Sequence, residues 1–208
     1  MRMIAGPNGS GKSTLIETLR HAIPFGIYIN ADEIELSLKK KPALHFDDFS
    51  IFVSQKRFQS FVGKKSTIGS ADFKTEIFSA VNIHNNILTA QPAIINSYFA
   101  SLVADFIKHE LLKEYQNFSF ETVMSHPSKI KMIESANKKN YRTYLYFIST
   151  DDPSINYGRI VGRVKKGGHK VSSEKIKERY QRSLKLLNKA ISKSYRAYIF
   201  DNTVYGRI

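Results

Sequence analysis

A run of eight residues, 6–13, constrains the fold of this chain more than any other segment. Its sequence, GPNGSGKS, fits the pattern G-x-x-x-x-G-K-[ST] at every defined position. Glycines at three of these positions permit backbone conformations that side chains exclude, so successive N–H groups can converge on one anion. The run therefore predicts a loop that binds phosphate.

The sequence around this loop fits the same interpretation. Residues 3–5 are apolar, as in a short strand, and residues 14–23 carry apolar side chains at helical spacing. Strand, glycine-rich loop and helix are the order that a nucleotide-binding loop requires. Lys12 can reach the β- and γ-phosphates of ATP or GTP, and the Ser13 hydroxyl can ligate Mg²⁺. The nucleotide-binding residues that we predict are Gly6, Pro7, Asn8, Gly9, Ser10, Gly11, Lys12, Ser13, Thr14 and Asn202.

Length and composition limit the remaining possibilities. A chain of 208 residues suggests one domain, 1–208, and the lack of cysteine excludes disulfides and thiolate metal sites. The most apolar long segment, 94–112, contains Asp105, Lys108, His109 and Glu110, so it is too short and too charged to span a bilayer. The phosphate loop begins at residue 6 and leaves no room for a targeting signal. We therefore expect a cytoplasmic protein that does not contact membranes.

The formal net charge of +14 indicates anionic partners. Nucleotides, phosphorylated sugars, nucleic acid and an acidic protein all remain candidates, as does a merely lysine-rich surface. The basic residues are scattered in pairs and triplets, and the chain has no long basic tail. Nucleic acid is therefore the less favoured partner.

Strands and helices are predicted to alternate along most of the chain. Strand candidates at 26–30, 118–122, 141–149 and 197–200 are separated by helical segments. This order predicts an α/β fold: a P-loop NTPase or kinase core with a parallel sheet flanked by helices. Residues 42–115 are predicted to be mostly helical, with Phe49, Phe52 and Phe58 among the residues on one side of a helix. We therefore predict a helical insertion after the second strand, at about 36–115.

Acidic residues follow two of the predicted strands, where ligands gather in such sheets. Asp32 can accept the proton of an acceptor hydroxyl, although it can equally cap the following helix, with help from Glu35. Glu121 can orient a substrate hydroxyl or an Mg²⁺-bound water, or simply begin a helix. We place Glu33 and Thr122 with these acids in a predicted acceptor site.

Arg159 and Arg163 lie four residues apart and share one helix face, just before the basic, glycine-containing segment 164–170. Such a segment can form a basic lid, at about 159–172, whose arginines neutralise charge on a transferred phosphoryl group. His169 falls within this lid and is assigned to the acceptor site. The alternative is a solvated basic face.

Several segments together resemble the zeta-toxin-like P-loop kinases, particularly the branch called predicted ABC-type ATPases. These segments are 5–14 (AGPNGSGKST), 29–34 (INADEI), 120–122 (FET), 159–164 (RIVGRV), 167–171 (GGHKV), 179–184 (RYQRSL) and 201–203 (DNT). The resemblance covers essentially the whole chain apart from about 42–95.

The resemblance implies a kinase that uses ATP or GTP with Mg²⁺ to phosphorylate a UDP-activated amino sugar. It implies that Asp32 is the catalytic base, Lys12 the phosphate-loop lysine, Glu121 a substrate-site acid and Arg163 a transition-state arginine. A second family arginine falls near His169 here, which is a departure from the family. An antitoxin is implied as a protein partner. Two other hypotheses stay open: a nucleic-acid kinase or ATPase, and a non-catalytic ATP-binding protein.

Overall fold

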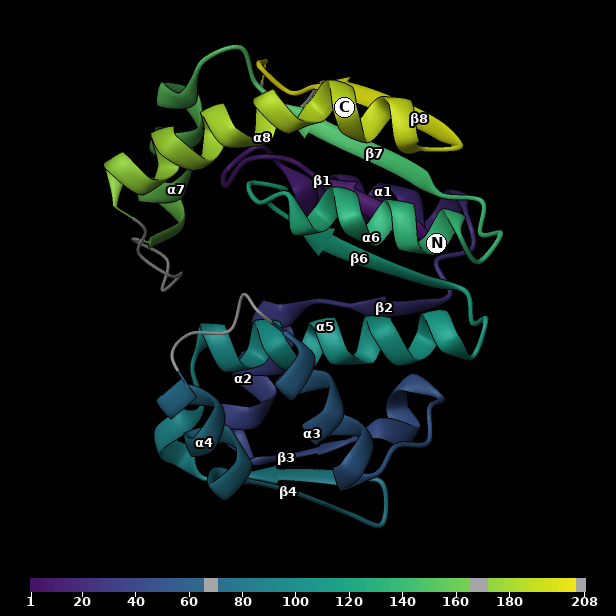
Figure 1. The fold of residues 1–208 in the computed structure, drawn as a ribbon. Helices are drawn as coiled ribbons and strands as arrows, with labels where there is room; N and C mark the ends of the chain where they lie inside the picture. Colours follow the sequence, from purple (N-terminus) through teal and green to yellow (C-terminus); the bar gives the residue numbers. More distant parts are fainter. Residues whose placement is uncertain (66–70, 165–171, 205–208) are drawn as a thin grey trace. The chain divides into compact units, whose positions relative to one another are not determined.

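The computed structural model describes residues 1–65, 71–164 and 172–204. The chain divides into two compact units, which are described separately (Figure 1). The first unit comprises Met1–Gly26 and Asn117–Ile208, and the second comprises Ile27–Gln116. The second unit contains the whole of the segment predicted as an insertion.

A parallel sheet forms the centre of the first unit. Its strands are β1 (Arg2–Ala5), β6 (Phe118–Thr122), β7 (Tyr144–Ser149) and β8 (Arg196–Asp201), and they run in the order β6-β1-β7-β8. The central strand β1 aligns Ala5 with Thr122 on one side and with Phe147 on the other. Because all four strands are parallel, their carboxyl ends lie along the same edge of the sheet.

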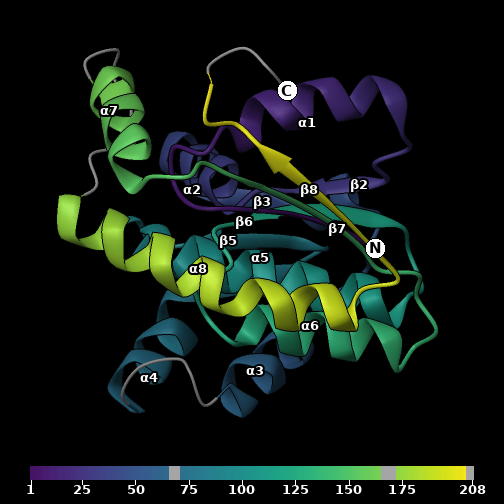
Figure 2. The ribbon, with the colours of Figure 1, turned by 90° about the horizontal axis from the view of Figure 1, so that it is seen from above.

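Four helices accompany this sheet: α1 (Lys12–Ala22), α6 (Ser128–Asn137), α7 (Pro153–Val164) and α8 (Ser173–Lys193). Figure 2 shows α1 on one face of the sheet, with α6 and α8 on the other. Ser172 caps α8, and its hydroxyl accepts a hydrogen bond from the backbone N–H of Lys175. This architecture confirms the predicted α/β fold with a parallel sheet flanked by helices.

The inner strands are apolar because helices cover both of their faces. Ile4 and Ala5 of β1 and Leu145, Phe147 and Ile148 of β7 are completely buried. Continuous apolar runs of this kind lack the alternation of a half-exposed strand. They explain why the sequence predicted parallel strands at these positions.

The second unit combines helices with a small antiparallel sheet. Its helices are α2 (Ala31–Lys40), α3 (Gln55–Lys64), α4 (Ala71–Ala80) and α5 (Ser97–Lys113), with 3-10 turns η1 (Phe46–Phe49) and η2 (Pro92–Ile94). The sheet consists of β3 (Ala43–His45), β4 (Val81–His84) and β5 (Ile87–Ala90). A further short strand, β2 (Ile27–Ile29), begins the unit and is not part of this sheet. Strands β3, β5 and β4 pair antiparallel in that order. The prediction of a mostly helical segment at 42–115 missed this sheet.

A two-residue turn explains the sheet. Asn85 and Asn86 both have positive φ angles, 48° and 63°, and His84 pairs with Ile87 across the turn. Asparagine tolerates this backbone region, so two such residues suit a tight β-hairpin. The alternating sequence on either side of Asn85 and Asn86 was the signal that the helical interpretation overlooked.

Asn86 also explains why Phe49 and Phe52, which the sequence analysis placed on one helix with Phe58, lie before the start of α3. Its side chain is buried, accepts from the Val53 N–H at 2.9 Å and donates to the Ile51 carbonyl at 2.9 Å. These bonds hold residues 51–53 in an irregular segment. As a result Phe49 and Phe52 precede the helix, and α3 starts only at Gln55.

Phe106 of α5 is at the centre of the core of the second unit. Its ring is completely buried and lies 5.8 Å from Phe46, 5.1 Å from Phe58 and 5.4 Å from Phe61, centroid to centroid. The first two pairs meet edge to face, which is a favourable geometry for aromatic rings. One side chain thus joins η1, α3 and α5.

Within the described residues, no helix has the length and apolarity needed to cross a membrane.

We expect Phe106→Ala to lower the free energy of unfolding by about 3–5 kcal/mol, because it leaves a cavity between three aromatic rings. Chemical denaturation of the full chain measures this loss. Phe52→Ala is the matched control, because Phe52 belongs to the same unit and is 74% exposed. Equal losses for the two variants would contradict this description of the core.

Candidate phosphate-binding site

The phosphate loop leaves the carboxyl end of the central strand β1 and leads directly into α1. Gly9 and Gly11 have φ angles of 77° and 99°, a region that side chains disfavour. Gly11 is also the N-cap of α1 and has no side chain with which to cap it. The first N–H groups of the helix therefore remain oriented toward the loop, together with the positive end of the helix dipole.

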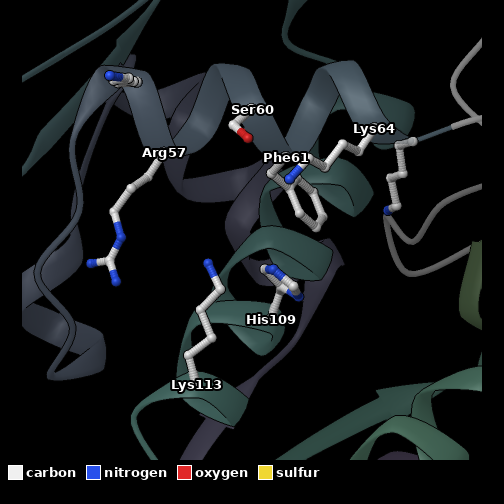
Figure 3. Close-up of a pocket in the computed structure, with 8 residues that line it drawn as sticks. Arg57, Ser60, Phe61, Lys64, His109 and Lys113 are labelled. Atoms are coloured by element: carbon white, nitrogen blue, oxygen red, sulfur yellow. The ribbon is translucent and has the colours of Figure 1, made fainter.

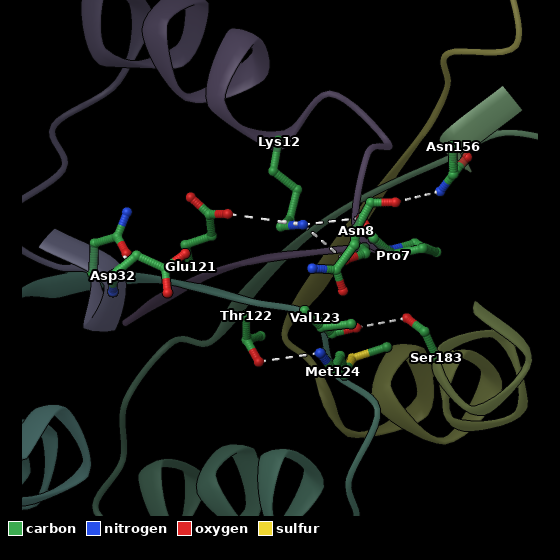
Figure 4. A network of polar contacts seen from close by, with 12 residues as sticks. Pro7, Asn8, Lys12, Asp32, Glu121, Thr122, Val123, Met124, Asn156 and Ser183 are labelled. Carbon is green, nitrogen blue, oxygen red and sulfur yellow. Dashed lines mark hydrogen bonds and ion pairs between the residues drawn. The ribbon is translucent and has the colours of Figure 1, made fainter. Parts of the chain in front are cut away.

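Lys12 points back into the loop. Its ammonium donates to the carbonyl oxygens of Gly6 and Pro7, each at 3.0 Å, and its side chain is only 7% exposed (Figure 4). The cation is thus held at the centre of the loop, where it can neutralise phosphate charge. The role predicted for Lys12, contact with the β- and γ-phosphates, stays a prediction.

Glu121 lies beside this lysine. One carboxylate oxygen is 3.7 Å from the Lys12 ammonium, and the Glu121 side chain is 20% exposed. The proximity follows from the sheet, because β6 pairs with β1 and aligns Glu121 with Ile4. The backbone carbonyl of the next residue, Thr122, accepts a hydrogen bond from the Gly6 N–H at 3.2 Å. The structure thus brings together Lys12, Glu121 and Thr122, which the sequence assigned to adjoining sites.

Asn156 anchors the loop and was not found by the sequence analysis. It is completely buried in the first turn of α7, and its side-chain amide donates to the Asn8 carbonyl at 2.8 Å. The side-chain oxygen of the same amide, Asn156 Oδ1, accepts a hydrogen bond from the Thr150 hydroxyl, just after β7. No motif marks Asn156, because its importance depends on a contact between residues 148 positions apart.

Asn202 provides a second anchor. Its amide donates to the Ser10 carbonyl at 2.8 Å, and it lies so close to Gly11 that a Cβ there would be 2.3 Å from the amide nitrogen. The sequence predicted a nucleotide contact for Asn202; the structure places its side chain on the loop backbone. Arg159 in turn donates to the Asn202 carbonyl at 2.8 Å. Arg159, predicted as catalytic, is therefore positioned to hold the Asn202 backbone.

The neighbouring strand ends are ordered by local hydrogen bonds. The Tyr180 hydroxyl donates to the Thr150 carbonyl at 2.6 Å, and burial raises the pKa of this phenol, so it stays protonated. Hydrogen bonds from Ser154 lower the pKa of Asp152, and those from Thr203 lower the pKa of Asp201. Both carboxyl groups are therefore ionised at neutral pH and hold the turns after β7 and β8.

Two polar atoms in the loop are buried and have no hydrogen-bond partner in the protein: the Asn8 side-chain oxygen and the Ser10 hydroxyl. Buried polar groups of this kind are rare unless a ligand or water completes them. Ser13 and Thr14, by contrast, expose their side chains on the first turn of α1. Among the described residues, no group of three or more His, Asp or Glu side chains is arranged to bind a metal ion.

Asp32 lies in the second unit, on the first turn of α2. Asn30 caps this helix, because its side chain accepts the Asp32 N–H at 2.9 Å and donates to Glu33 at 3.4 Å. The alternative role of Asp32 as the N-cap is therefore wrong, and its exposed carboxylate remains available for other contacts. Glu35 pairs with Lys39 at 2.5 Å and does not assist a cap.

The predicted lid is only partly described. Arg163 is exposed near the end of α7, on the same helix as Arg159. His169 and the segment 165–171 lie outside the described residues. The structure thus provides contacts for Arg159 but leaves the role of Arg163 and His169 as predictions.

A parallel sheet whose central strand leads through a glycine-rich loop into a helix, with the loop lysine held inside, defines the P-loop class of α/β proteins. Comparison with protein families identifies the group within this class. The model of the zeta toxin family matches residues 72–205, and the chain belongs to that family. The match includes Glu121, Asn156 and Asn202 but begins after the phosphate loop, so the loop is supported by its own sequence and geometry.

Solved structures show the same fold. The chain aligns over its full length, and over 87% of the other chain, with a candidate kinase from Chloroflexus aurantiacus, at 10% identity and a TM-score of 0.51. It also aligns with a protein of the PezAT chromosomal toxin-antitoxin system of Streptococcus pneumoniae, at 16% identity and a TM-score of 0.51. That alignment covers 96% of this chain and 66% of the other.

A curated sequence from Haemophilus influenzae, named only as an uncharacterized protein, is 32% identical over 72 residues. The aligned region is 35% of this chain and 51% of the relative, so the chain spans about half the length of the curated relative that it matches. This match supports common ancestry over a short region and carries no information on activity.

We expect Asn156→Ala to destabilise the protein by about 1–3 kcal/mol and to weaken ATP binding, because the Asn8 carbonyl loses its donor. Calorimetry and thermal denaturation measure the two effects. Asn137→Ala is the control, because Asn137 also donates to a backbone carbonyl, that of Lys193 at 2.7 Å, in the same unit. An equal loss of ATP affinity in both variants would show that Asn156 has no specific effect on the loop.

Gly9→Ala should distort the loop, because the added Cβ would lie 2.5 Å from the Asn156 carbonyl and φ is positive. We expect lower stability and loss of ATP binding. Gly162→Ala adds the same methyl group on α7, where it meets open space among the described residues, and should stabilise the helix by about 0.5–1 kcal/mol. Opposite shifts in melting temperature for these variants support the loop conformation, and shifts of the same sign contradict it.

Proposed function

We propose that this protein is an ATP- or GTP-dependent phosphotransferase of the zeta-toxin type. It transfers the γ-phosphoryl group to a hydroxyl of a small molecule, and a UDP-N-acetyl amino sugar is the candidate acceptor. The observation that carries the proposal is the Lys12 ammonium, held inside the loop by two carbonyls with the Glu121 carboxylate at 3.7 Å. Membership of the zeta toxin family supports it.

The phosphate loop binds the donor in this proposal. The N–H groups of the loop and of the first turn of α1 donate hydrogen bonds to the phosphate oxygens, and Lys12 neutralises part of the phosphate charge. The buried Ser10 hydroxyl is available as a further donor. The exposed Ser13 hydroxyl fits a ligand of Mg²⁺, which would offset the charge of the β- and γ-phosphates.

Asp32 is the proposed base. The acceptor oxygen forms a bond to the γ-phosphorus, the bond from that phosphorus to the bridging oxygen of the β-phosphate breaks, and the hydroxyl proton passes to the Asp32 carboxylate. The exposure of this carboxylate, with Asn30 as the helix cap, supports the assignment. Glu33, Glu121, Thr122 and His169 are proposed to orient the acceptor.

Arg163 is proposed to stabilise the charge on the transferred phosphoryl group, because its exposed side chain follows Arg159 by one turn of α7. Arg159 is proposed to act on the same site, and its bond to the Asn202 carbonyl gives it a fixed position. The basic segment at about 159–172 remains the proposed lid.

We further propose that residues 1–208 act as one kinase domain, in which the insertion at about 36–115 selects the acceptor. An antitoxin is the proposed protein partner, and the cytoplasm is the proposed location. Zeta-toxin membership and the fold shared with the PezAT protein support these assignments.

Incubation with ATP or GTP, Mg²⁺ and a panel of UDP-sugars tests the activity, with the phosphorylated product identified by mass spectrometry. Lys12→Ala and Asp32→Ala should each lower the rate by about 10²–10³-fold, as expected for single electrostatic contributors. Lys12→Ala should also weaken nucleotide binding, whereas Asp32→Ala should leave it intact.

Asp48→Ala is the matched control for Asp32, because it removes another exposed carboxylate of the second unit. Its rate should stay within about twofold of the unmodified chain. Binding of ATP without transfer to any UDP-sugar or related metabolite would exclude the zeta-type assignment. Turnover that is unchanged in Asp32→Ala would exclude Asp32 as the base.

A further inference from the structure

A basic groove lies within the second unit, between α3 and α5, and none of its lining residues belongs to the proposed kinase site. Its volume is 570 Å³, and cationic and aromatic side chains line it (Figure 3). The lining residues are Lys56, Arg57, Ser60, Phe61, Lys64, Lys65, His109 and Lys113. A groove of this size is larger than a single phosphate needs and is comparable with small-molecule sites.

The two helices present regular faces to this groove. Arg57, Phe61 and Lys64 recur at intervals of four and three residues on α3, and His109 and Lys113 are four apart on α5. Residues with these spacings lie on one side of a helix. From Arg57 to Lys64 the helix rises about 10 Å. Most of the cations that line the groove therefore come from α3 and its C-cap Lys65, and α5 contributes Lys113.

Carboxylates pair with several of these cations. Arg57 pairs with Glu110 at 3.3 Å and with Glu114 at 3.5 Å, and Lys113 pairs with Glu110 at 2.7 Å. Asp105 similarly holds Lys65. Five cationic side chains line the groove against these three carboxylates, so it keeps a net positive charge. Side chains that are already ordered lose less entropy when they bind an anion.

An aromatic surface accompanies the charge. The ring of Phe61 lies 5.2 Å from the ring of His109, and the Lys65 ammonium lies 5.1 Å from the Phe61 ring. His109 is exposed and Phe61 is partly exposed, so both rings are accessible from the groove. A cationic groove with accessible rings is the combination that binds unpaired bases together with their phosphates.

We propose that this groove binds single-stranded nucleic acid, with the phosphates along the cations of α3 and α5 and one base against Phe61. Five cations against three carboxylates leave enough net positive charge for about two phosphates of the strand. An acidic peptide would use the same cations but has no requirement for the rings. The site lies entirely within the second unit and does not depend on the proposed kinase activity.

Binding of a fluorescent twelve-nucleotide oligothymidylate to the full chain, measured by anisotropy at several salt concentrations, tests the proposal. For two phosphate contacts, the logarithm of the affinity should fall against the logarithm of the salt concentration with a slope of about −1.4. The double variant Lys56→Gln/Lys64→Gln should bind at least about tenfold more weakly at low salt, because it removes two phosphate contacts.

Lys185→Gln/Lys189→Gln is the matched control, because it removes two exposed lysines of α8 in the first unit and lowers the net charge equally. It should change the affinity by less than about twofold. Equal losses in the two double variants would show that only the overall charge attracts the oligonucleotide, and would overturn the proposal.

Phe61→Leu tests the aromatic contact, because leucine keeps an apolar side chain against Phe106 but has no ring face. We expect at least about fivefold weaker binding, as for the loss of one stacked base. The melting temperature identifies any unfolding, and His109→Gln gives a second test at an exposed position. Unchanged affinity in both folded variants would overturn the aromatic contact.

Two further measurements separate this site from its alternatives. Lys12→Ala should leave oligonucleotide binding intact, and its loss would place the oligonucleotide in the phosphate loop instead. Polyglutamate of similar length should compete poorly. If it displaces the oligonucleotide at lower concentration than unlabelled oligothymidylate does, an acidic polypeptide is the ligand and the proposal is wrong.

Discussion

The parallel pairing of β1 with β6 and β7 is the constraint on which the candidate site depends. It aligns Ala5 with Thr122 and with Phe147, so the phosphate loop starts beside the ends of two neighbouring strands. Glu121 reaches Lys12 for this reason, and Thr122 binds the Gly6 N–H. A shift in this register would separate the acid from the lysine while leaving the loop sequence unchanged.

The loop conformation is maintained by residues far along the chain. Asn156 and Asn202 donate to carbonyls of Asn8 and Ser10, and Arg159 holds the backbone of Asn202. These bonds direct loop carbonyls toward side chains, which leaves N–H groups of the loop and of α1 available to an anion. The ends of β7 and β8 therefore support the phosphate loop as well as completing the sheet.

Local patterns account for most of the fold that could be predicted. Apolar runs located β1 and β7. The sheet of the second unit was missed because its strands are only three or four residues long. Its clearest signal was the pair Asn85 and Asn86, which is a signal for a turn and gives no evidence for helices.

The sequence by itself determined the phosphate loop, because glycine conformations and a lysine at fixed spacing are local properties. Tertiary structure decided which polar groups surround it: Asn156 has no recognisable motif, and Asn30 rather than Asp32 caps α2. It also decided the basic groove. Lys113 and His109 of α5 join the cations and Phe61 of α3 only when the two helices pack together, since helix packing brings residues some fifty positions apart into contact.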